Sequence, residues 1–240
     1  LKQVEGLLPA PTSVADTDIS PQLIGDLVMK AIHQYTTLSV TRISDMLKLP
    51  FFGVVEPVLT SLRKSELVEI SHSEGLGEMT YQWVLTPKGR ERVREILNRS
   101  NYVGPAPVSL EKYRRIVRVQ TITNLRVVPA QVKAALADMV VSDDLMEVIG
   151  PAINTGQSIF LYGAAGNGKT FLSEHIARLL TGDIFIPYAI EADGFIIKVF
   201  DPNIHEISND PLAQADPTSE HNRVDTRWAL CRRPVVVVGG

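Results

Sequence analysis

Apolar residues recur at helical spacing in three stretches near the start of the chain. The first follows Ser20-Pro21, where the serine can cap a helix and the proline suits its first turn. The second begins near Ser39, and the third runs from about Phe51 to Lys64. Pro57 lies inside the third stretch and should kink or delay that helix, because proline lacks the amide hydrogen that a helix interior needs.

The pattern then changes to that of a strand hairpin. Two runs of strand-forming residues, Leu67–Ser71 and Thr80–Leu85, flank the turn Glu74-Gly75-Leu76-Gly77, and Thr86-Pro87 opens a helix through about Asn98. Three helices, a hairpin and a closing helix within ~80 residues resemble a winged helix-turn-helix domain. The stretch from Tyr81 to Arg90 is similar to the wing-to-helix segment of many bacterial winged-helix regulators.

The remaining segments complete a four-part organisation. Residues 1–20 are polar, without a sustained apolar period, and are expected to form a flexible tail. Residues 21–103 are expected to form the domain that resembles a winged helix, and Gly104-Pro105-Ala106-Pro107 is expected to open a linker over 104–126. Its residues 109–125 are expected to form a helix or plain linker, and they carry Lys112, Arg114, Arg115 and Arg118.

From residue 127 to 240 the pattern is mixed α/β. It predicts a helix over Asp143–Thr155, a short buried strand over Ser158–Tyr162, a glycine-rich loop and a helix through Leu180. Ile184–Ala192 and Phe195–Phe200 flank Asp193-Gly194, a strong signal for a type I′ hairpin. The interpretation that it only extends a sheet is preferred over one in which it contacts a substrate or a neighbouring subunit. The last apolar run, Val235–Val238, is expected to be a buried strand.

Composition limits the kinds of protein this can be. Hydrophobic residues make up 45% of the chain and charged residues 21%, so a packed core is expected. The formal net charge of −3 offers no global attraction for nucleic acid or an anionic membrane. No apolar run approaches the ~20 residues of a membrane span. The single cysteine, Cys231, excludes an internal disulfide, which suits the cytoplasm.

The glycine-rich loop carries the chemistry. Gly163-Ala164-Ala165-Gly166-Asn167-Gly168-Lys169-Thr170 fits the phosphate-binding pattern G-x-x-x-x-G-K-S/T without a mismatch. Glycines let the backbone wrap closely around phosphates and aim successive amides inward, and the following helix presents its positive end to the same anion. Lys169 should reach the β- and γ-phosphates, and the Thr170 hydroxyl should bind Mg²⁺. ATP is the expected nucleotide, because no guanine-recognition motif is present.

This loop, with Phe160-Leu161-Tyr162 before it, resembles the Walker A segment of the AAA+ ATPases. Many members have two prolines where this chain has Ala164-Ala165. The helix containing Ile149-Gly150-Pro151 looks like the AAA+ segment that runs over the adenine. The fold class expected is therefore an AAA+-like α/β P-loop NTPase preceded by a small α+β winged helix-turn-helix domain. The predicted nucleotide-binding residues are Gly163, Ala164, Ala165, Gly166, Asn167, Gly168, Lys169, Thr170, Phe171, Ile149 and Gly150, with Lys169 also predicted to be catalytic.

The arrangement is similar to bacterial predicted ATPases with chaperone activity that are linked to pilus assembly. That resemblance implies an ATP-driven homo-oligomeric ring that remodels a protein partner, with the winged helix as adaptor. Hydrolysis also needs an acidic residue at the end of a neighbouring strand. Val235–Val238 ends in Gly239-Gly240 and offers no carboxylate, so we expect the acid beyond residue 240 and little hydrolysis by this chain alone.

Two alternative functions and two alternative residue roles stay open. One is a nucleotide-responsive DNA-binding regulator, in which Glu56, Thr60, Ser61, Arg63 and Lys64 on the third helix and His72, Glu74 and Glu78 on the wing form the surface. Because this surface has few cations for phosphates, a protein partner is preferred. Another is a scaffold that senses nucleotide without hydrolysing it. An arginine finger could come from one of four arginines, and a surface role is favoured for each: Arg223, Arg227, Arg232 and Arg233. A metal site is less favoured than a solvated loop for the group Asp201, His205, Glu206 and Asp210.

Overall fold

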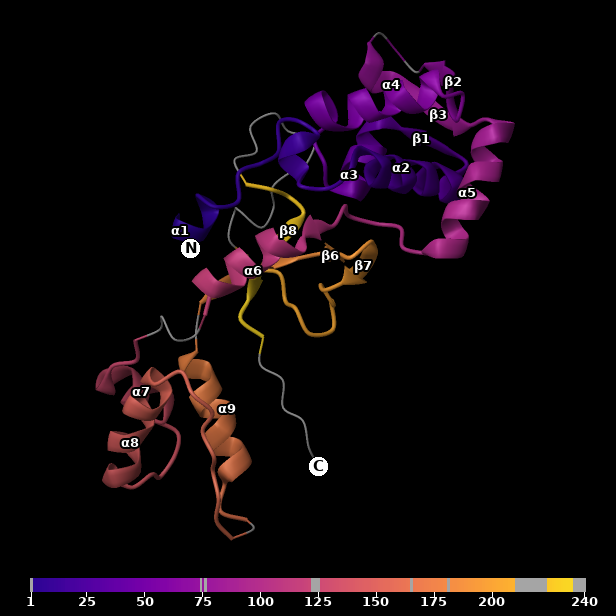
Figure 1. The fold of residues 1–240 in the computed structure, drawn as a ribbon. Coiled ribbons are helices and arrows are strands. Elements are labelled where there is room, and N and C mark those ends of the chain that lie inside the picture. Colours follow the sequence, from indigo (N-terminus) through magenta and orange to yellow (C-terminus); the bar gives the residue numbers. More distant parts are fainter. Residues whose placement is uncertain are drawn as a thin grey trace.

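The chain has a mixed α/β fold with several small sheets. The computed structural model describes residues 2–73, 75, 77–121, 126–164, 166–180, 182–209 and 224–234. Residues 21–99 gather at one end, the helices of residues 129–179 lie at the other, and the strands of residues 183–232 lie between them (Figure 1). Within the described ranges, no helix is both long and apolar enough to cross a membrane.

Residues 21–99 form a helical body with one three-stranded sheet. The sheet is antiparallel, and the third strand in chain order lies between the first and the second. The elements in chain order are α2 (Pro21–Tyr35), β1 (Thr37–Ser39), α3 (Val40–Leu47), the irregular helical segment η2 (Phe51–Val55), α4 (Glu56–Lys64), β2 (Val68–Ser73), the short 3-10 helix η3 (Glu78–Thr80), β3 (Tyr81–Leu85) and α5 (Pro87–Arg99).

Three of these helices begin where the sequence predicts. The side chains of Ser20, Ser39 and Thr86 each accept a hydrogen bond from a backbone amide three residues further on, at 3.1, 3.3 and 3.0 Å. Such caps satisfy amides that have no partner inside the helix. Pro57 delays its helix, as expected, because α4 begins only at Glu56 and the backbone at Phe52 and Gly53 is not helical.

The core of this body is continuous from α2 to the sheet. Ile24, Leu27 and Val28 of α2 are buried together with Leu59 of α4 and Trp83 of β3. Burying each of these side chains stabilises the fold by about 1.5–3 kcal/mol. The apolar faces of these helices and strands, which the periodicity of the sequence predicts, therefore pack into one common core.

The N-terminal segment is packed, so the flexible tail predicted for residues 1–20 is wrong for the described residues. It contains α1 (Lys2–Glu5) and the short helix η1 (Ala15–Thr17). Leu8 is fully buried, and its carbonyl oxygen accepts a 2.9 Å hydrogen bond from the Asp225 amide. The segment has too few apolar residues to show a period, but Val4 and Leu8 fill gaps in a cluster built by distant strands.

Between the two ends lies a region of two small sheets. β4 (Val108–Ser109) pairs in parallel with β6 (Ala189–Ala192), which pairs antiparallel with β7 (Phe195–Lys198). β5 (Asp183–Pro187) pairs antiparallel with β8 (Trp228–Arg232). The predicted hairpin is confirmed: Asp193 and Gly194 link β6 to β7 with φ of 52° and 83°, as a type I′ turn requires.

The linker predicted for residues 104–126 is also wrong where the structure describes it. It contains β4 and the helix α6 (Leu110–Val119), which contacts β6. Ile116 of α6 is fully buried, whereas Arg114, Arg115 and Arg118 are exposed. The proline-rich opening misled the sequence interpretation, because Ala106 and Val108 after it are core residues.

A buried ionic cluster joins three distant segments of this region. The Arg227 guanidinium donates to the Asp225 carboxylate at 3.0 and 2.8 Å and to the carbonyl oxygens of Thr17 and Pro107 at 2.8 and 2.9 Å. The Lys112 ammonium donates to the same carboxylate at 3.0 Å. Asp225 and Arg227 are fully buried and Lys112 nearly so. Both cations thus share one carboxylate as their counter-ion, and the cluster ties the N-terminal segment to α6 and β8.

The remaining helices form a separate three-helix unit, which we call the loop unit: α7 (Pro129–Ala135), α8 (Asp143–Asn154) and α9 (Lys169–Leu179). Leu172 of α9 packs with Val132 of α7 and with Ile149 and Ile153 of α8. Gly156 follows α8 with φ of 65°, as expected for a glycine that ends a helix.

The buried strand predicted at Ser158–Tyr162 is wrong. No strand is assigned there, and Phe160 and Tyr162 are each 85% exposed, with their rings stacked 6.1 Å apart. A strand needs a hydrogen-bonded neighbour, and the neighbour that we expected, Val235–Val238, lies outside the described residues. An apolar run alone did not supply that pairing.

Candidate functional site: a phosphate-binding loop

The glycine-rich loop lies directly before helix α9. Gly166 and Gly168 have φ of 81° and 68°, a left-handed conformation that favours glycine, and a Cβ at either position would meet no neighbour within 4 Å. The loop surface is therefore open. Gly163, Ala164 and Asn167 are exposed as well, and Ala165 lies outside the described residues.

The first turn of α9 presents amides toward the loop. Gly168 is the N-cap, and the Leu172 amide donates to its carbonyl oxygen at 2.8 Å, which closes the first turn. The amides from Gly168 to Phe171 precede that bond and have no acceptor within the helix. An anion at this end gains both hydrogen bonds and the favourable end of the helix dipole.

Two side chains of this turn carry the predicted phosphate and metal roles. The Lys169 ammonium donates a 2.8 Å hydrogen bond to the Ala164 carbonyl oxygen, so the side chain folds back over the loop. Thr170 is exposed at the second helical position. A polyphosphate bound over the loop would lie within reach of this ammonium group, and the Thr170 hydroxyl is the type of hard oxygen ligand that Mg²⁺ prefers.

The other predicted nucleotide-binding residues have different surroundings. Phe171 is 48% exposed, and the centre of its ring lies 4.2 Å from that of the His175 ring. Its carbonyl oxygen accepts a 2.8 Å hydrogen bond from the His175 imidazole. Ile149 is only 4% exposed and packs inside the loop unit, and a Cβ at Gly150 would press on Val132. The structure therefore places Ile149 and Gly150 in the packing between α8 and α7, while Phe171 stays next to the loop.

The arginine-finger candidates are engaged elsewhere. Arg227 is fully buried in the ionic cluster, and Arg232 pairs with Glu206 at 3.1 Å. Arg233 donates to the Gln120 carbonyl oxygen at 3.2 Å, and Arg223 lies outside the described residues. A finger role for Arg227 is wrong, because a side chain with no exposed surface cannot reach a neighbouring subunit.

Two members of the predicted acidic group, Asp201 and His205, form local loop contacts, whereas Glu206 pairs with Arg232. The His205 imidazole accepts from the Asp201 amide at 2.9 Å, and the Asp201 carboxylate accepts from the Asn203 amide at 2.9 Å. That amide hydrogen bond is the main reason that the pKa of Asp201 is lowered. Asp210 lies outside the described residues. In the part of the chain that the structure describes, no group of three or more His, Cys, Asp or Glu side chains could hold a metal ion.

Sequence reasoning missed the Asp225 cluster. Asp225 and Arg227 are two residues apart, but Lys112 is 113 residues from Asp225 in sequence. Only the fold brings them together, and an aspartate and an arginine near a strand are an ordinary surface pattern.

Comparisons with protein-family models, with curated proteins and with solved structures find no match for this chain. Its function therefore has to be inferred from its own residues and their geometry.

Proposed function

We propose that this protein binds a nucleoside triphosphate, with ATP as the expected nucleotide, on the loop Gly163–Thr170. The observation that carries the proposal is a complete phosphate-binding motif placed at the N-terminus of α9, with its glycines in left-handed conformations. The amides of the first turn bind the phosphates, Lys169 neutralises charge on the β- and γ-phosphates, and the Thr170 hydroxyl binds Mg²⁺.

The further proposal is an AAA+-type ATPase that remodels a protein partner as a homo-oligomer. Its support is the resemblance of the loop to the Walker A segment and the body formed by residues 21–99. The helix and strand order of that body, with β1 joining the β2–β3 hairpin, supports a winged helix-turn-helix. That domain would serve as the adaptor for the partner.

A second candidate function is nucleotide-responsive DNA binding. The observation in its favour is that Arg63 and Lys64 are exposed at the end of α4, the third helix of the winged-helix arrangement, and that three arginines are exposed on α6. Duplex binding that weakens steeply with salt would favour this function, because each phosphate contact that forms releases counterions and adds to that slope. If the protein binds no duplex at low salt, the DNA-binding candidate is wrong and the protein-partner proposal is retained.

The nucleotide proposal is tested by calorimetric titration with Mg-ATP. Lys169→Ala should weaken binding by at least about tenfold, because hydrogen bonds from a charged donor contribute roughly 1.5–3 kcal/mol. Lys133→Ala is the matched control, since Lys133 is an exposed lysine on α7 of the same unit. Equal affinities of the Lys169→Ala variant and the parent would disprove the site assignment.

A further inference from the structure

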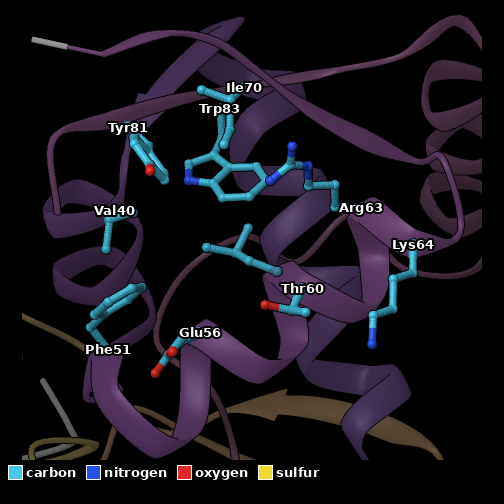
Figure 2. A pocket seen from close by; sticks show the side chains of 10 residues that line it. Val40, Phe51, Glu56, Thr60, Arg63, Lys64, Ile70, Tyr81 and Trp83 are labelled. Atoms are coloured by element: carbon cyan, nitrogen blue, oxygen red, sulfur yellow. The ribbon is translucent and has the colours of Figure 1, made fainter. Parts of the chain in front are cut away.

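A cavity of about 370 Å³ lies between helix α4 and the sheet of strands β1–β3, distant in sequence from the phosphate loop (Figure 2). Cavities of this size accept small organic ligands. The lining is mostly apolar and aromatic, with polar groups at its edges. The residues that matter for its chemistry are Phe51, Glu56, Arg63, Lys64, Tyr81 and Trp83.

The Trp83 indole gives the cavity a specific polar requirement. Trp83 is 94% buried, being only 6% exposed, and its Nε1–H has no acceptor among the described residues. A buried donor without a partner is costly, so such a group is usually satisfied by a ligand or by water. Figure 2 shows the nitrogen edge of the indole turned toward Tyr81, on the side of the cavity away from Arg63.

The charges around the cavity are asymmetric. Arg63 and Lys64 are exposed at one side, and neither forms an ion pair with any residue in the described ranges. Glu56 lies at another side, near Phe51 (Figure 2). A bound anion is therefore attracted toward the end with the two cations and repelled by Glu56.

We propose that this cavity is a binding site for a small aromatic carboxylate. Its ring system lies against Trp83 and Tyr81, where aromatic faces and edges pack favourably. Its carboxylate faces Arg63 and Lys64, and an oxygen at the opposite end of the ring system accepts the Trp83 indole hydrogen bond. This site is separate from the phosphate loop and does not depend on nucleotide binding.

The test uses a naphthoate with a methoxy group on the ring remote from the carboxylate. The full chain has two tryptophans, so its proton–nitrogen correlation spectrum contains two indole signals, which a Trp228→Phe variant assigns. The probe should shift the Trp83 signal and leave that of Trp228, which does not line this cavity, in place. An unmoved Trp83 signal at millimolar probe would overturn the proposal.

Charge variants test the orientation of the ligand. Arg63→Gln should weaken binding of the methoxynaphthoate by about fivefold, as expected for a partly exposed ion pair. It should leave binding of the corresponding neutral naphthylmethanol unchanged. Arg94→Gln, at an exposed arginine of α5 outside the cavity, is the matched control and should change neither affinity. Equal weakening by Arg94→Gln, or equal loss of the alcohol in Arg63→Gln, would refute the assigned carboxylate end.

Discussion

Replacing Asp225 by Asn should destabilise the region between the two ends of the molecule. The substitution keeps the size of the side chain but removes the negative charge that two buried cations share. Asp225 accepts three side-chain hydrogen bonds of 2.8–3.0 Å from Arg227 and Lys112, and Arg227 in turn donates to the carbonyl oxygens of Thr17 and Pro107. Breaking a buried ion pair by removing one partner costs about 3–5 kcal/mol.

That loss is large against a total stability of about 5–15 kcal/mol for a typical domain. The assay is urea unfolding followed by fluorescence in a Trp83→Phe background, where the signal comes from Trp228, which is buried three residues from Asp225. Asp193→Asn is the matched control, because Asp193 is exposed in the hairpin turn and Asn tolerates its left-handed backbone. That control should change stability by less than about 0.5 kcal/mol. If Asp225→Asn unfolds at the same urea concentration as Asp193→Asn, the cluster does not hold this region together.

Three further predictions follow from particular residues. Burial alone raises the pKa of Asp225, but the charges and hydrogen bonds of Arg227 and Lys112 outweigh it and lower the pKa. The ionised Asp225 therefore stabilises the folded state fully above the ordinary aspartate pKa of about 4, and this contribution is lost as the pH falls toward the lower folded-state pKa. Over that pH range the urea midpoint of the parent should fall more than the midpoint of Asp225→Asn. Gly89→Ala should lower the melting temperature, because the new methyl group would overlap the Leu67 carbonyl oxygen, whereas Gly25→Ala meets Leu62 at an ordinary 3.5 Å and should not. Thr170→Ala should mainly reduce the magnesium-dependent part of ATP binding, and an unchanged magnesium response in calorimetry would count against the role of its hydroxyl.

The helices were predictable where local chemistry defines them. Ser20, Ser39 and Thr86 cap their helices as the sequence indicates, and Pro57 delays α4, because capping and the missing proline amide act within one turn. The Asp193-Gly194 hairpin was predictable for the same reason, since the turn type needs two residues that tolerate positive φ.

The packing of short segments was not predictable. Leu8 and Lys112 are buried because strand β8 and its neighbours bring Asp225 and Val224 to them from the far end of the chain. A polar segment with one or two apolar residues looks the same whether or not a distant partner covers it. The predicted strand at Ser158–Tyr162 was wrong for a related reason, because strand formation depends on a neighbour that the local pattern does not contain.

The sequence predicted the position of the candidate phosphate loop, but only part of the geometry of the residues around it. The motif itself places Lys169 and Thr170 in the first turn of a helix, where the structure has them. The positions of Ile149 and Gly150 depend on how α8 packs on α7, and that packing is not encoded in the motif.

The central claim is that the loop and the first turn of α9 bind a triphosphate, and backbone amide resonances measure this directly. Titration with Mg-ATP should shift the amide signals of Gly166, Gly168, Lys169 and Thr170 more than those of any other described segment. Adenosine without phosphates should leave them unchanged. If Mg-ATP binds without moving these four signals, or moves only those of another segment, the nucleotide is bound elsewhere and the claim is wrong.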